Sequence, residues 1–239
     1  MTQAILQPND RYAVVGKTGS GKSAFGMTLA GTFARSLPDP WEVWWIDSKN
    51  DRKDKETLRS WGFRNGVSES DRQTSGAIRG AYYFCIDGSN DRFSADVVSQ
   101  AQALIKMAYN RRNVIIVIDE YTQVVPSSRS PGKALQDVFA RGRSNNVGII
   151  GMTQEPVFVP RQLLSQASHL VMFSLSYQYD ITYMKKIDPI YQSPNKLGFK
   201  HGFFWKWLDG DDTTTFYEHQ KEWYDSSNVK FEDGSAEES

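Results

Sequence analysis

The sequence contains a single cysteine and no long apolar run. One cysteine excludes an intrachain disulfide, and Cys85 lies within the apolar stretch 81–86, so we expect a buried strand residue and not a nucleophile. No stretch approaches the ~20 apolar residues that span a bilayer, and the first residues lack the charged and apolar regions of a signal peptide. We therefore expect a soluble protein without a membrane partner, located in the cytoplasm, or in the host cytoplasm if the protein is viral.

The sequence also lacks net charge, because 28 lysine and arginine residues balance 28 aspartate and glutamate residues. Composition alone thus gives no indication of a nucleic-acid partner, and any such indication has to come from local features. A length of 239 residues suits one α/β domain with a small appendage.

The most informative stretch is an apolar run at 12–15 that leads directly into Gly-Lys-Thr-Gly-Ser-Gly-Lys-Ser at 16–23. This matches the phosphate-binding P-loop, in which glycines let backbone N–H groups surround a polyphosphate. Lys22 is expected to reach the β- and γ-phosphates, and the Ser23 hydroxyl to ligate Mg²⁺. The predicted ligands are ATP and Mg²⁺, and the predicted nucleotide-binding residues are Gly16, Lys17, Thr18, Gly19, Ser20, Gly21, Lys22, Ser23 and Ala24.

Strand-like and helix-like segments alternate along the chain, which indicates βαβ units and a parallel sheet. Strands are predicted at 12–15, 41–47, 81–87, 114–118, 147–153 and 170–175. Helices are predicted at 23–35, 51–59, 95–112, 133–143, 161–167 and 179–187, with Ser94 as a helix cap. The stretches 61–80 and 125–132 are predicted to be loops.

The end of the chain differs in character. Two aromatic and threonine-rich runs, 202–208 and 213–218, flank an Asp-Gly turn and predict a β-hairpin. Its aromatic residues Phe203, Phe204, Trp205 and Trp207 suit base stacking, extra sheet strands or a subunit interface, of which we favour the interface. From residue 225 onward the composition predicts a disordered acidic tail. The expected organisation is a core at 1–198, a hairpin extension at 199–224 and a tail at 225–239.

A second polar signal follows the β-branched run at 114–118. Asp119 is placed as the Walker B acid that holds Mg²⁺ through water, and Glu120 is placed to polarise an attacking water molecule. This pair favours hydrolysis over phosphoryl transfer to a small acceptor.

Three further residues are candidates for the reaction. Gln154 ends the next predicted strand, where it could touch the γ-phosphate or the attacking water, although such a residue is often only a solvated loop entry. Arg141 and Arg143 end the preceding helix. They could stabilise the helix C-terminus by ~0.3–1 kcal/mol, or act as an arginine finger in a neighbouring subunit, an effect worth ~10³–10⁵ in rate.

Taken together, these motifs resemble the FtsK/HerA family of DNA-pumping P-loop ATPases. The resemblance rests on the order of the P-loop, the Ile-Asp-Ser-Lys turn at 46–49, the Val-Ile-Asp-Glu run at 117–120, Gly-Arg-Ser at 142–144 and the run to Gln154 at 148–154. Two departures are Ser48, where the family usually has proline, and Glu155-Pro156, where an arginine is common.

The resemblance implies a RecA-like ATPase core that works as a hexameric or pentameric ring around double-stranded DNA. It implies Gln154 as the polar sensor and Arg143 or Arg141 as the finger. Because only about ten residues precede the first predicted strand, the chain is most similar to viral genome-packaging ATPases, which implies capsid vertex proteins as partners. Candidate DNA contacts are the cations Arg129, Lys133 and Arg161.

Other function classes stay open at this point. A small-molecule P-loop kinase would have a lid of arginines and no glutamate after the Walker B acid, so Glu120 and Gln154 speak against it. A non-motor nucleotide switch is not excluded by any sequence feature, and neither is another FtsK/HerA-type transfer ATPase of a mobile element. An ABC-type ATPase is disfavoured because no Leu-Ser-Gly-Gly-Gln-like signature is present.

Overall fold

The computed structural model describes residues 7–49, 51–66, 80–86, 95–199, 201–210 and 213–217. Their strands form one nine-stranded sheet in the order β3-β4-β2-β5-β6-β1-β7-β8-β9. Pairing is parallel from β3 to β7 and antiparallel for the last two strands. The strands are β1 (Arg11–Val15), β2 (Glu42–Asp47), β3 (Arg64–Asn65), β4 (Ala81–Cys85), β5 (Val114–Ile118), β6 (Val147–Thr153), β7 (His169–Met172), β8 (Phe203–Trp207) and β9 (Thr214–Tyr217).

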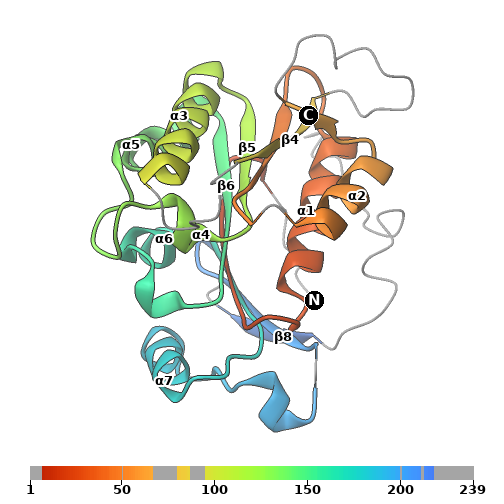
Figure 1. Cartoon of the computed structure of the whole chain (residues 1–239). Helices are drawn as coiled ribbons and strands as arrows, with labels where there is room; N and C mark the ends of the chain where they lie inside the picture. The colour runs from red at the N-terminus through yellow and green to blue at the C-terminus, as the bar shows by residue number, and fades with distance from the viewer. Residues whose placement is uncertain are drawn as a thin grey trace, which may run out of the picture.

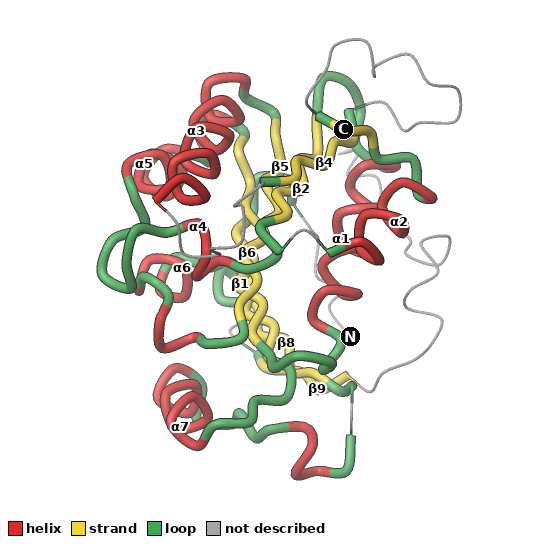
Figure 2. The backbone as a smooth tube through the Cα atoms, in the orientation of Figure 1, coloured by secondary structure: helices red, strands yellow, loops and turns green. Residues whose placement is uncertain are grey.

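Helices cover both faces of this sheet (Figure 1). On one side lie α1 (Lys22–Ser36) and α2 (Arg52–Ser60). The helices on the other side are α3 (Ala95–Arg111), α4 (Tyr121–Val124), α5 (Lys133–Arg141), α6 (Arg161–Ser165) and α7 (Gln178–Ile187). Single 3₁₀ turns occur at Arg143–Asn145, Pro156–Phe158 and Pro194–Leu197. The trace in Figure 2 shows the strands as a twisted layer between the two groups of helices.

The central strands are apolar on both faces because each face packs against helices. Along β1, Tyr12 and Val14 belong to the core beneath α1 and α2, whereas Ala13 and Val15 belong to the core on the opposite side. Every residue of β5 and β6 is buried. The predicted α/β fold with a mainly parallel sheet is therefore confirmed, and the strands predicted at 114–118 and 147–153 have the observed bounds.

Several boundaries differ from the sequence prediction. The stretch from residue 61 contains the two-residue strand β3, and the short helix α4 follows Glu120 directly. The helix predicted to run to residue 143 ends at Arg141, after which Gly142 begins a tight turn that returns the chain into β6. The strand predicted at 170–175 covers only His169–Met172. The predicted Ser94 cap and the acidic tail lie outside the described residues.

The C-terminal hairpin is part of the main sheet, since β8 pairs with β7. Phe203 and Phe204 are buried on opposite faces, one in each core. The Trp205 indole donates a hydrogen bond to His169 Nδ1 at 3.2 Å. The extra-strand interpretation accounts for the two phenylalanines, and the subunit interface that we favoured is not needed to explain them.

None of the described helices is both long and apolar enough to cross a membrane.

Candidate functional site

The site lies where parallel strands end at one edge of the sheet. In doubly wound sheets, ligands bind outside the carboxyl ends of the strands. Here β1 ends in the P-loop, β5 ends in Asp119 and Glu120, and β6 between them ends next to Gln154. The strand order therefore places Gln154 between the P-loop and the two acids.

The P-loop is anchored on β6 and on the segment that follows β7, and these two strands are the neighbours of β1. The backbone N–H of Gly16 donates to the Thr153 carbonyl at 3.1 Å, and that of Lys17 donates to the Ser174 carbonyl at 2.8 Å. A Cβ at position 16 would lie 2.6 Å from Phe173 Cβ, so only glycine fits this passage. Gly19 and Gly21 have φ angles of 73° and 105°, a left-handed region that favours glycine. These contacts fix the loop in a turned conformation.

The residues at the end of the P-loop suit an anionic ligand. Gly21 caps α1 without a side-chain hydrogen bond, so the first N–H groups of the helix have no capping partner. The Ser20 hydroxyl is buried and has no hydrogen-bond partner among the described residues. Lys22 is 4% exposed, and burial together with the charge of Lys49 lowers its pKa, which the negative charges of Asp119 and Glu120 counteract. A bound polyphosphate would supply the negative charge that this ammonium lacks.

Asp119 and Ser23 are adjacent, as the metal site requires. The Ser23 hydroxyl donates to Asp119 Oδ1 at 3.2 Å, and Asp119 is 1% exposed. Hydroxyl and carboxylate oxygens are hard donors of the kind that Mg²⁺ prefers, and this ion takes its other ligands from phosphates and water. Within the described ranges there is no cluster of three histidine, cysteine, aspartate or glutamate side chains that could hold a metal by itself. Ser23 and Asp119 therefore fit an ion that is shared with a nucleotide.

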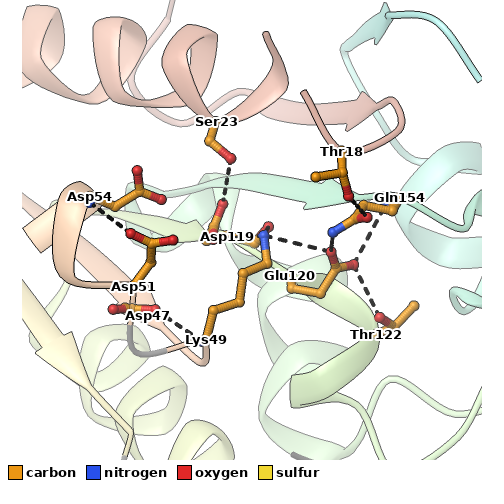
Figure 3. Close-up of polar contacts among 10 residues, drawn as sticks. All are labelled: Thr18, Ser23, Asp47, Lys49, Asp51, Asp54, Asp119, Glu120, Thr122 and Gln154. Carbon is orange, nitrogen blue, oxygen red and sulfur yellow. Dashed lines mark hydrogen bonds and ion pairs between the residues drawn. The ribbon is translucent and has the colours of Figure 1, made fainter. Parts of the chain in front are cut away.

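Glu120 is held by a chain of hydrogen bonds that begins in the P-loop. The Thr18 hydroxyl donates to Gln154 Oε1 at 2.5 Å, and Gln154 Nε2 donates to Glu120 Oε2 at 3.0 Å (Figure 3). The other carboxylate oxygen accepts from the Thr122 hydroxyl at 3.1 Å. Glu120 is 4% exposed. A carboxylate that is fixed in this way can accept a proton from a water molecule at one defined place.

Lys49 is a site residue to which sequence reasoning gave no role. It follows β2, the neighbour of β5, and its ammonium lies 2.8 Å from Asp119 Oδ2 and 3.7 Å from Glu120 Oε2. Burial opposes its charge, but the charge and hydrogen bond of Asp119 outweigh that effect and raise the pKa of Lys49. The available signal was a lysine in the turn that follows the strand predicted at 41–47. Thr122 was missed as well, because α4 was not predicted.

The two arginines lie at the opposite end of the sheet. They precede β6, and its seven residues, at about 3.3 Å each, put them roughly 20 Å from their own P-loop. The Arg143 guanidinium contacts the Ser168 hydroxyl at 2.7 Å and the Asp209 carboxylate. The Arg141 side chain is exposed and forms no hydrogen bond or ion pair with any described residue. Neither arginine belongs to the P-loop site of its own chain.

The candidate DNA-contacting cations lie on the surface. Arg129 and Arg161 are exposed, and exposed Lys133 pairs with Asp137 at 3.2 Å. The loop before α5 is fixed by Gln102 of α3, whose Nε2 donates to the carbonyls of Val124 and Pro131. Gln102 Oε1 also accepts from the backbone of Ala134.

Comparison with solved structures finds this fold in other proteins. B204, the DNA-packaging ATPase from Sulfolobus turreted icosahedral virus, superposes with a TM-score of 0.63 at 17% identity, over 89% of this chain and 98% of that one. A B204 structure from the related virus 2, in complex with ATP-gammaS, gives a TM-score of 0.62 at 17% identity over the same shares. The fold is that of a RecA-like P-loop NTPase.

A more distant structure shares this fold. ATPases 2 and 3 of EccC from Thermomonospora curvata give a TM-score of 0.52 at 15% identity, over 88% of this chain and 36% of that one. The similarity to viral packaging ATPases that the motifs indicated is thus confirmed at the level of the fold. No family model and no curated protein matches the chain.

The acidic surroundings of the site predict a pH-dependent change in stability. Burial, and then the negative charges of Asp119 and Asp51, raise the pKa of Asp54 from 3.8 to about 6. The folded state therefore binds this proton more tightly than the unfolded state, and ionised Asp54 destabilises the fold above pH 6. We expect Asp54→Asn to increase the free energy of unfolding at pH 7.5 by up to ~1 kcal/mol, a figure reduced for solvent screening of a partly exposed group.

This gain should disappear as the pH falls from 6 to 4, where Asp54 is protonated in the folded protein. Urea unfolding at pH 7.5 and pH 4.5 measures this gain in the free energy of unfolding. Asp96→Asn on α3 is the matched control, because Asp96 lies outside the group formed by Asp51, Asp54 and Asp119. An equal gain at both pH values would show that charge is not the cause.

Proposed function

We propose that this chain is an ATP hydrolase that translocates double-stranded DNA, and that it works as a viral genome-packaging motor. The main support for hydrolase activity is the chain of hydrogen bonds from Thr18 through Gln154 to Glu120. Buried Lys22 and Asp119 belong to the same site. These hydrogen bonds join the phosphate-binding loop to a buried carboxylate suited to activate water. A kinase for small metabolites would not have a glutamate at this position, so Glu120 speaks against that alternative.

In the proposed reaction, the backbone of residues 16–23 and Lys22 hold the β- and γ-phosphates. Mg²⁺, when bound by Ser23 and Asp119, would neutralise charge on the phosphate oxygens. Glu120 accepts a proton from the attacking water, and Gln154 keeps that carboxylate in place and presents its amide toward the P-loop. The water oxygen bonds to the γ-phosphorus as the bond from that phosphorus to the β–γ bridging oxygen breaks, giving ADP and phosphate.

Replacing Glu120 should separate binding from turnover. We expect Glu120→Gln to keep ATP affinity and to lose ~10²–10⁴ in kcat, the usual contribution of a general base. Lys22→Ala should instead lose nucleotide binding. Fluorescent-nucleotide titration and phosphate release measure the two quantities. Glu155→Gln, an exposed neighbour, is the matched control and should retain wild-type turnover. Equal rates for wild type and Glu120→Gln would exclude this residue as the base.

The proposal of a DNA motor is supported by the similarity to B204, which covers nearly the whole of that chain. Exposed cations at Arg129, Lys133 and Arg161 are available for phosphate contacts. We further propose a homo-oligomeric ring of five or six subunits with DNA in its channel, which docks at a capsid vertex in the host cytoplasm.

The motor predicts that double-stranded DNA stimulates ATP hydrolysis and that this stimulation weakens between low and moderate salt, since phosphate contacts release counterions. Steady-state phosphate release with and without DNA, with sedimentation of the same samples, measures both stimulation and ring formation. Hydrolysis that ignores DNA in a stable monomer would favour a nucleotide switch instead.

The distance between the arginines and their own P-loop supports a finger that acts on a neighbouring subunit. Arg141 is the stronger candidate, because Arg143 already binds Ser168 and Asp209 of its own chain. We expect Arg141→Ala to lose ~10³ or more in kcat with unchanged ATP affinity. A mixture of Arg141→Ala and Lys22→Ala subunits should regain activity. In such a mixture, the intact P-loop of an Arg141→Ala subunit can lie next to the intact Arg141 of a Lys22→Ala subunit. Failure of mixing to restore any activity would contradict action across an interface.

A further inference from the structure

The Asp119 carboxylate has both of its oxygens occupied by protein groups. Oδ1 accepts from Ser23 at 3.2 Å, and Oδ2 contacts the Lys49 ammonium at 2.8 Å. The side chain is 1% exposed, so solvent does not reach it freely. From this geometry we infer that Lys49 competes with Mg²⁺ for Asp119 and makes metal binding depend on the charge that a nucleotide brings.

The two contacts on Asp119 differ in their relation to a metal. The Ser23 hydroxyl donates its proton to Oδ1 and keeps its lone pairs, which remain able to ligate an ion. The ammonium of Lys49 has only donors, and it uses the oxygen that a metal or a metal-bound water would need. The Ser23 bond is thus compatible with Mg²⁺, whereas the Lys49 contact has to be given up.

Lys49 has a second partner close by. Its ammonium lies 3.7 Å from Glu120 Oε2, and Figure 3 shows the lysine reaching between the two acids from the end of β2. An ammonium that leaves Asp119 can therefore move to Glu120 and stay paired within the site. The exchange requires a rotation of the lysine side chain and no change in the backbone.

Charge balance explains why a nucleotide would favour this exchange. Lys49 pairs with Asp119 and Glu120, and the buried ammonium of Lys22 interacts electrostatically with the same two acids. A divalent cation alone would add two positive charges beside these two ammonium groups and would have to displace Lys49 from Asp119. A polyphosphate brings several negative charges, so metal and nucleotide should bind together. The inference rests on the proposed function only in assigning Asp119 to the metal.

The test uses the metal alone and needs no hydrolysis. Binding of Mn²⁺, which accepts the same oxygen ligands as Mg²⁺, is measured on the full chain without nucleotide, by electron paramagnetic resonance of the free ion. We expect Lys49→Met to bind Mn²⁺ roughly tenfold more tightly than wild type, within the usual range for coupling between two binding events. Lys49→Arg, which keeps the positive charge, should show no gain.

Two controls identify the cause. Lys53→Met removes an exposed cation from the adjacent helix α2 and should leave Mn²⁺ affinity unchanged. Lys49→Met combined with Asp119→Asn should lose the gain, because the contested carboxylate is absent. If Lys49→Met does not fold, Lys49→Gln provides a neutral polar alternative for the same titration.

Unchanged or weaker Mn²⁺ binding in Lys49→Met, or in Lys49→Gln where that variant is needed, would overturn the inference. So would a gain that survives Asp119→Asn, or an equal gain in Lys53→Met. Failure of the proposed function has a different signature, namely a wild-type chain that neither binds nor hydrolyses ATP while the metal titrations behave as described.

Discussion

The site depends on one constraint, which is that the parallel strands β2, β5, β6 and β1 end at the same edge of the sheet. Buried apolar side chains on both faces fix the register of these strands, as the pairing of Val15 with Thr153 and of Ile118 with Gly151 illustrates. This strand framework brings together polar residues that are far apart in the sequence. The P-loop, Gln154 and the two acids are the first residues beyond this framework.

The two buried carboxylates of the site have partners close by. Lys49 forms ion pairs with Asp119 and Glu120, and Ser23, Thr122 and Gln154 donate hydrogen bonds to the same carboxylates. An unpaired charge at this depth would cost several kcal/mol or would neutralise itself by a pKa shift. A charged ligand that binds here changes the electrostatic interactions of the other charged groups. Binding of nucleotide, binding of metal and the positions of Lys22 and Lys49 are therefore coupled.

Much of this arrangement could be predicted from the sequence. The P-loop motif, the β-branched strand before Asp119 and the apolar strand before Gln154 follow from local patterns, because periodicity and turn residues act over a few positions. The partnership between Lys49 and Asp119 could not be predicted in this way, since it depends on β2 lying next to β5. Strand order is a property of the whole chain and leaves little local signal.

The hairpin shows a similar limit. Its two strands were visible as aromatic runs, but the pairing of β8 with β7 depends on a register that local pattern does not encode. The same holds for the contact of Arg143 with Asp209, which joins two elements at the far end of the sheet. For the hairpin residues and Arg143, the sequence left several roles open. The tertiary contacts identify their neighbours within the chain.

The three hydrogen bonds from Gln102 have a consequence for recognition. They hold both ends of the segment between α4 and α5, and within it the Arg129 N–H donates to the Ser127 hydroxyl and Ser127 bridges to Ser130. When a partner binds this loop, the main chain would lose little conformational entropy, and most of the loss would come from the arginine side chain. Recognition through this loop would therefore resemble contact with a rigid surface and not the folding of a flexible arm.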